Sequence, residues 1–168
     1  LFAGFLSSAD SAQYFLFADE SGDQSAAATL ESVKPSHFKS VRRFRHVTLT
    51  PTVKTGDSLT CGDVLTLNLF EDTAYTARID RIHTNVNGTV SIRARLDDYP
   101  MGCLLISTTG DESLAAIHIP EKARQYCIQN NPAAGEHYLY EVDAEGIEAL
   151  EDNLPQASAE DTYLMAEE

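Results

Sequence analysis

The side chains that could carry out chemistry are scattered singly along this sequence. Its histidines and cysteines include no His-Glu-x-x-His and no Cys-x-x-Cys spacing. Gly-x-Ser-x-Gly and a glycine-rich phosphate loop are also missing. Zinc needs several ligands in a defined geometry, which isolated histidines seldom supply. We therefore expect no catalytic residue, no cofactor site and no metal site here, and we do not expect the chain to be an enzyme by itself. The residues concerned are His37, His46, His83, His118, His137, Cys61, Cys103 and Cys127.

Adjacent carboxylates occur twice, at Glu71-Asp72 and at Asp97-Asp98. Both pairs stand at the ends of predicted strands, where neighbouring acids usually cap turns rather than share a proton. Three cysteines allow at most one disulfide and leave one thiol free. Neither group of residues predicts an active site.

The net charge of −14 is concentrated at one end of the chain. Residues 1–135 hold 15 acidic and 12 basic residues, whereas residues 136–168 hold 11 acidic residues and no lysine or arginine. A body so close to neutral lacks the broad basic face that nucleic acids need, so nucleic acid is not an expected partner. No apolar run has membrane-spanning length, so we expect no membrane span.

The stretch from Tyr99 to Ile119 predicts the centre of a β-sheet. Met101–Ser107 is apolar on both strand phases, which predicts a strand buried on both sides, with Leu105 and Ile106 both in the core. A Thr-Thr-Gly-Asp turn and an alternating strand to Ile119 complete a hairpin. Upstream, Thr89–Leu96 alternates most cleanly, with Val90, Ile92, Ala94 and Leu96 on one face.

The remaining strands follow the same alternation. Leu65, Leu67 and Leu69 share one face, and the pattern of the next strand reverses phase at Ile82, which indicates a bulge or the end of the strand. Arg42, Arg43 and Arg45 are interleaved with apolar residues, which predicts the solvent-facing side of a strand; a protease cleavage site and an anion contact are the alternatives. Tyr126 and Ile128 are expected inward, and Tyr138, Tyr140 and Val142 are expected on one face.

These patterns predict an all-β fold, an antiparallel β-sandwich or flattened barrel of about eight to nine short strands. A short C-terminal helix over Ala144–Asp152, with Asp143 as its N-cap, and an acidic tail would follow. We divide the chain into an N-terminal arm (1–40), a β-sandwich domain (41–152) and an acidic linker or tail (153–168). Residues 1–13 begin with an apolar run followed by small residues, which is the pattern of a signal-peptide remnant and equally of an N-terminal strand.

The order of the strand motifs resembles the prodomain of bacterial reprolysin- or adamalysin-like zinc metalloproteases, the ADAM-type branch of the metzincins. The resemblance covers Gly56 to Asp152. The matching pieces are Leu65-Thr66-Leu67-Asn68-Leu69-Phe70, Asp98-Tyr99-Pro100, Leu105-Ile106-Ser107-Thr108, Leu114–Ile119, Tyr126-Cys127-Ile128-Gln129 and His137–Val142 with the acidic segment that follows.

The chain departs from this family at two points. Where animal members form a disulfide, this chain has Val90 and Thr109. The zinc-ligating cysteine switch of the family also has no match, because no cysteine follows Cys127. The resemblance therefore implies the bacterial branch and a zinc-blocking device that is not one of these thiols.

The resemblance implies a non-catalytic prodomain, secreted or held in the cell envelope, that acts as a folding scaffold and latency module. Its expected partner is the cognate metalloprotease catalytic domain, in cis or as a cleaved chain, which would hold the zinc. Carboxylates of the acidic tail are candidates for contacting that domain, with Asp152 and Asp161 the first to test. The alternative is a free-standing secreted β-sandwich that binds a carbohydrate or a protein.

Overall fold

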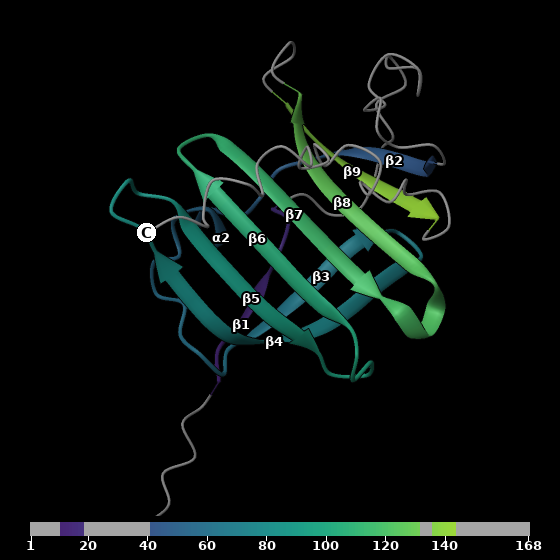
Figure 1. Ribbon diagram of the computed structural model, residues 1–168, viewed down its shortest axis with the longest axis horizontal. Coiled ribbons are helices and arrows are strands. Elements are labelled where there is room, and N and C mark those ends of the chain that lie inside the picture. The colour runs from purple at the N-terminus through teal and green to yellow at the C-terminus, as the bar shows by residue number, and fades with distance from the viewer. Residues whose placement is uncertain (1–10, 19–40, 132–135, 144–168) are drawn as a thin grey trace, which may run out of the picture.

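The computed structural model describes residues 11–18, 41–131 and 136–143, which form one curled sheet (Figure 1). The sheet has nine strands among these residues, in the order β1-β3-β4-β5-β6-β7-β8-β9-β2. Their bounds are β1 Gln13–Phe15, β2 Val41–Val47, β3 Val64–Phe70, β4 Thr73–Thr84, β5 Val90–Leu96, β6 Cys103–Thr109, β7 Glu112–Ile119, β8 Arg124–Asn131 and β9 Glu136–Asp143.

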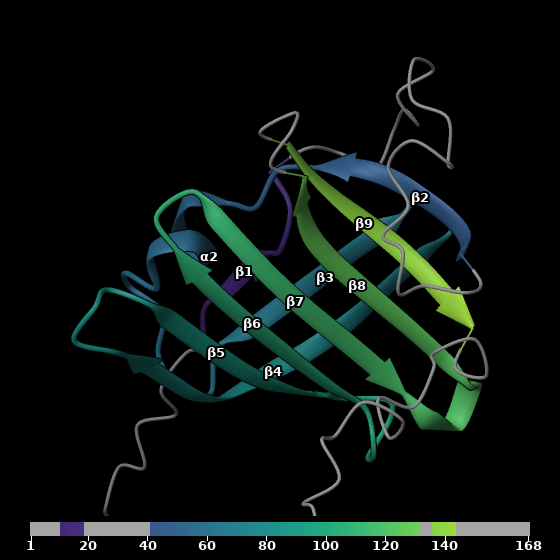
Figure 2. The ribbon, with the colours of Figure 1, turned by 45° about the horizontal axis from the view of Figure 1, so that its top comes forward.

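Strands β3 to β9 form an antiparallel meander in which each strand pairs with the next. The two remaining strands lie at the edges: β1 pairs in parallel with β3, and β2 pairs antiparallel with β9. The sheet curls into a half-barrel, so the strands of its two halves cross in front of one another in Figure 2. The all-β prediction is confirmed, but a single curled sheet replaces the expected closed sandwich.

The inner face of the curl holds the hydrophobic core. Alternation places one side chain in two inside on every strand, because successive residues of a strand point to opposite faces. Leu65, Leu67 and Leu69 of β3, Ile92 of β5 and Ile117 of β7 are fully or almost fully buried there. Expected inward positions on β5, β7 and β8 are confirmed.

A short helix that sequence reasoning did not predict covers one end of the half-barrel. Helix α2 spans Pro51–Thr55, with a proline in its first turn and Gly56 as its left-handed C-cap. Its Val53 is fully buried, and the Thr108 hydroxyl donates to the Lys54 carbonyl oxygen. A β-carbon at Gly56 would lie 2.8 Å from Val90 Cγ1, so both the backbone and the packing require glycine.

A cluster of tyrosines covers the opposite end. The Tyr75 and Tyr126 hydroxyls are 3.4 Å apart, and the Tyr75 and Tyr99 rings meet edge to face. Lys122, in the 3-10 turn η1 (Pro120–Lys122), places its Nζ 4.8 Å from the centre of the Tyr99 ring. A hydrogen bond with the Tyr99 side chain, and to a lesser extent the nearby Tyr75, raises the pKa of Lys122.

The two edges of the sheet approach each other without a full strand ladder between them. A single bridge joins Phe17 to Leu49, and Arg45 of β2 donates to the carbonyl oxygens of Asn68 and Leu69 at the end of β3. Arg45 is buried, so the predicted solvent-facing position is wrong for this residue. The reason is the curl, which turns the β2 edge toward β3, where unpaired carbonyl groups need donors.

Several other predictions fall on these strands. The hairpin of β6 and β7 is confirmed, and a register shift between Ile79 and Arg81 confirms the bulge expected near Ile82. Ile106 is buried as expected, but Leu105 is 50% exposed, so the prediction of a strand buried on both sides is wrong. One sheet has one covered face here, and Leu105 points away from it. The helix expected over Ala144–Asp152 and the tail lie outside the described residues.

Candidate protein-docking surface on the outer sheet face

The outer face of the sheet carries an apolar groove across its middle strands. Leu105 of β6 and Leu114 of β7 point outward and are about half exposed. In the same groove lie Ala116 and the side chain of Cys127, which the register places beside them on β7 and β8. The groove has a volume of about 560 Å³. Exposed apolar side chains gathered in a hollow are typical of protein interaction sites.

Arg81 of β4 and Arg93 of β5 line this groove, and Arg78 and Arg95 lie further along the same two strands. Arg78 lies opposite Arg95, and Arg81 lies opposite Arg93, so two pairs of like charges face each other across neighbouring strands. Directly opposed like charges destabilise a sheet. The Asp80 carboxylate, from the bulge of β4, accepts from Arg95 at 3.0 Å and lies 3.4 Å from Arg93. Asp97 lies 3.6 Å from Arg78, so two carboxylates stand against four arginines. The rim keeps a net positive charge, which favours an acidic partner.

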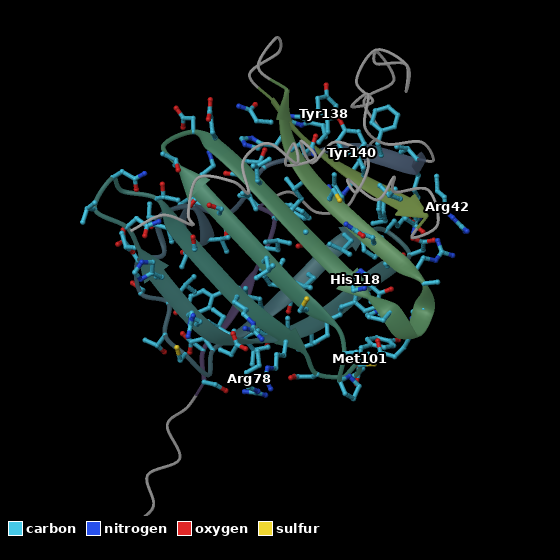
Figure 3. The ribbon with its side chains drawn as sticks, in the orientation of Figure 1. Arg42, Arg78, Met101, His118, Tyr138 and Tyr140 are labelled. Carbon is cyan, nitrogen blue, oxygen red and sulfur yellow. The ribbon has the colours of Figure 1, made fainter. Side chains whose placement is uncertain are left out.

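A second apolar cluster lies on the outer face at the β2 edge. It consists of Tyr138, Tyr140 and Val142 of β9 with Cys127 of β8, and Phe44 of β2 packs against it. Figure 3 places Tyr138 and Tyr140 together on the upper part of the β8–β9 region and His118 lower on the sheet. Burial raises the pKa of the Cys127 thiol and raises the pKa of Tyr140 to about 12. Both groups are therefore neutral at pH 7.

Three buried polar atoms without hydrogen-bond partners lie in one row of the inner face. They are Ser113 Oγ on β7, Asn130 Oδ1 on β8 and His137 Nε2 on β9. Asn130 pairs with His137, whereas the β7–β8 pairing ends at Ala115 and Ile128, so the two strands diverge beside Ser113. Figure 1 shows this divergence at the upper ends of β7 and β8. Burial, with the nearby Lys54 charge, lowers the pKa of His137.

A buried carboxylate on the inner face joins its own strand, β9, to the two strands beside it. Glu141 of β9 accepts from Arg43 of β2 and from Arg124 of β8. Arg43 also binds Asp72 and Thr73 and stacks its guanidinium over the Phe70 ring, 4.0 Å from the ring centre. All these polar groups are used in holding β2 against β9 and β3, and none is poised for catalysis.

The residues singled out in the sequence do not gather into one site. His46, His83, His118 and His137 lie on different strands, and among the described residues no group of three or more His, Cys, Asp or Glu side chains could hold a metal ion. Cys61, Cys103 and Cys127 are all free thiols. Asp152 and Asp161 lie outside the described residues. In the part of the chain that the structure describes, no helix has the length and apolar character to cross a membrane.

Sequence reasoning missed the groove and the arginine rim. The signal for the rim was present in Thr89–Leu96, whose outward positions carry Arg93 and Arg95. The signal for the groove was the two-sided apolar run at β6, which was interpreted as complete burial. An apolar outward position in the middle of a one-layer sheet points to a docking surface instead.

Comparisons with known proteins do not identify a function for this chain. No protein-family model and no curated protein matches the chain. A solved structure titled "Structure of a chaperone-substrate complex" is similar at 19% sequence identity and a TM-score of 0.48, over 62% of this chain and 87% of the other. That similarity is too low to carry a function across. The fold and the surface define a β-sheet module with a candidate docking face.

Proposed function

We propose that the chain is the non-catalytic prodomain of a secreted zinc metalloprotease, which binds the catalytic domain as a folding scaffold and keeps it latent. The observation that carries this proposal is the outer groove, with Leu105 and Leu114 half exposed beside the paired arginines. An isolated domain gains nothing from exposing two leucines in the middle of a sheet, whereas a partner that covers them stabilises the complex.

The order of the motifs supports the family assignment within this proposal. Five of the pieces that resemble the reprolysin-like prodomain fall on strands β3, β6, β7, β8 and β9 of the one sheet, and Asp98-Tyr99-Pro100 lies in the connection between β5 and β6. The zinc belongs to the partner's catalytic domain, and the acidic segment that follows β9 supplies carboxylates that could reach it. Asp152 and Asp161 are the first of these to substitute.

The test is inhibition of the cognate catalytic domain, sought in the reading frame beyond codon 168 or as a separate cleaved chain. The full chain added in trans is expected to inhibit peptide hydrolysis and to raise the yield of active enzyme on co-refolding. Leu105→Asp with Leu114→Asp is expected to weaken inhibition by at least about tenfold, since each removes a buried apolar contact of about 1–2 kcal/mol. Phe15→Asp, at an exposed apolar residue of β1, is the matched control.

A free-standing binding module for a protein ligand is the second candidate, because the same groove favours it. A carbohydrate ligand is less favoured: sugars stack on exposed aromatic rings, and Phe15 is the one aromatic residue among the exposed large apolar side chains of the described chain. Unchanged protease activity at saturating chain would contradict the prodomain proposal and leave this candidate.

A further inference from the structure

The outer-face cluster at the β2 edge is buried to an extent that one sheet layer does not explain. Tyr138 is 3% exposed, Tyr140 2% and Val142 0%, although their side chains point away from the core. Within the described strands, Val41, Phe44, His46 and Cys127 pack beside them, and all four lie in the same layer. Neighbours in a layer shield an outward side chain from the sides and leave its top open. A covering segment is therefore required.

The charge of each segment indicates which one covers the cluster. Residues 144–168 contain eight acidic residues and no lysine or arginine, whereas residues 19–40 contain four acidic residues and two lysines. The same outer face presents the positive rim of Arg78, Arg81, Arg93 and Arg95 on β4 and β5, beyond β7 and β6 from the cluster. The 144–168 segment also has apolar residues for the groove, among them Ile147, Leu150 and Leu154. Its composition complements both parts of the surface.

The distance to be covered is short. The segment begins directly after Val142 and Asp143, and in the paired register Val142 lies beside Gln125, followed by His118, Cys103 and Arg95 on successive strands. Four steps between neighbouring strands amount to about 19 Å at roughly 4.8 Å each. About six extended residues span that distance. A segment of 25 residues reaches both the groove and the arginine rim.

We propose that residues 144–168 fold back across the outer face, cover the tyrosine cluster and occupy the groove between Leu105 and Cys127, with their carboxylates on the arginine rim. The segment is then an internal occupant of the surface to which a partner protein would bind. The inference does not depend on the identity of that partner. If the proposed function holds, docking of the catalytic domain displaces the segment and frees its carboxylates.

Carbodiimide coupling in the full chain tests the placement directly. Arg81→Lys keeps the positive charge and supplies the primary amine that the reaction needs. We expect mass spectrometry to find an intramolecular amide from position 81 to an acidic residue of 144–168, and we expect 1 M salt to suppress it. Lys54 lies 3.9 Å from Asp111, so that pair is the internal positive control. Coupling only to Asp80, to residues 19–40 or to a second molecule would overturn the proposal.

The reactivity of Cys127 gives an independent measurement. In a full chain carrying Cys61→Ser and Cys103→Ser, we introduce a protease site after Asp143 and cut it once the protein has folded. Removal of the released segment is expected to raise the alkylation rate of Cys127 by about tenfold or more, and the synthetic 144–168 peptide is expected to restore protection. An unchanged rate, with circular dichroism showing the fold intact, would mean that another part of the chain covers Cys127.

Discussion

Leu105 and Ile106 are neighbours in β6, yet their side chains lie on opposite faces of the sheet and in opposite environments. Leu105 is 50% exposed on the outer face, and Ile106 is 3% exposed in the core. Ile106 therefore stabilises the fold, whereas Leu105 is available to a partner. Both are apolar residues of one run, so the sequence alone does not distinguish these two roles.

We expect Ile106→Ala to lower the free energy of unfolding by about 2–5 kcal/mol, because it removes buried methyl groups and leaves a cavity. In the chain cut after Asp143, the same change at Leu105 is expected to cost about 0.5–1 kcal/mol, since that side chain then contacts water. Urea denaturation of both variants measures the difference. Equal losses at the two positions would mean that the outer face is covered as tightly as the core.

Glu141 is expected to be the most sensitive charged residue. Glu141→Gln removes the negative charge that Arg43 and Arg124 share on the inner face, so both cations lose their buried partner. We expect a loss of about 1–3 kcal/mol in the free energy of unfolding, the range for hydrogen bonds to charged groups. Asp72→Asn, which removes the exposed partner of Arg43, is the matched control and is expected to change stability little. A similar loss from both variants would contradict the buried role of Glu141.

Acidic pH is expected to destabilise the fold through His137. Burial, with the Lys54 charge, lowers the pKa of His137 below its ordinary value of 6.5, so the unfolded chain takes up a proton first. The stabilisation from the neutral imidazole is thus complete above pH 6.5 and is lost as the pH falls through 6.5 toward the lowered pKa of the folded protein. We expect His137→Leu to flatten the pH dependence of the melting temperature between about pH 7.5 and 5.

The exposed His118 provides the control for that measurement. His118→Ala changes an exposed histidine on the outer face, so it controls for the loss of an imidazole that is not buried. Carboxylates add their own acid sensitivity below about pH 5, so the comparison is made above that value. An identical slope for the natural chain and the His137→Leu variant would show that His137 is not the titrating group.

In the chain cut after Asp143, where no acidic segment reaches the rim, removing one of the opposed arginines is expected to stabilise the fold. Arg81→Thr deletes a like-charge contact with Arg93 and places a β-branched residue in a strand, which together should add about 0.2–1 kcal/mol. Arg95→Thr also loses the hydrogen bond to Asp80, so it should gain less. Denaturation at low salt measures both changes, and at 1 M salt the gain from Arg81→Thr should shrink. A loss of stability in Arg81→Thr would indicate that this arginine is paired in the folded protein.

Alternation along the chain determined much of this architecture before any tertiary contact was known. The faces of β3, β5, β7 and β8, the β6–β7 hairpin and the bulge of β4 follow from local patterns, because a strand's side chains alternate whatever surrounds it.

Only the tertiary structure decided which faces are covered. Alternation shows that Leu105 and Ile106 point in opposite directions, but the number of layers determines whether both are buried, and this fold has one sheet. The curl of that sheet buried Arg45 by bringing β2 to the carbonyl groups at the end of β3. It also set Arg78 opposite Arg95 through the strand register. These contacts are between residues far apart in sequence, so local sequence patterns cannot predict them.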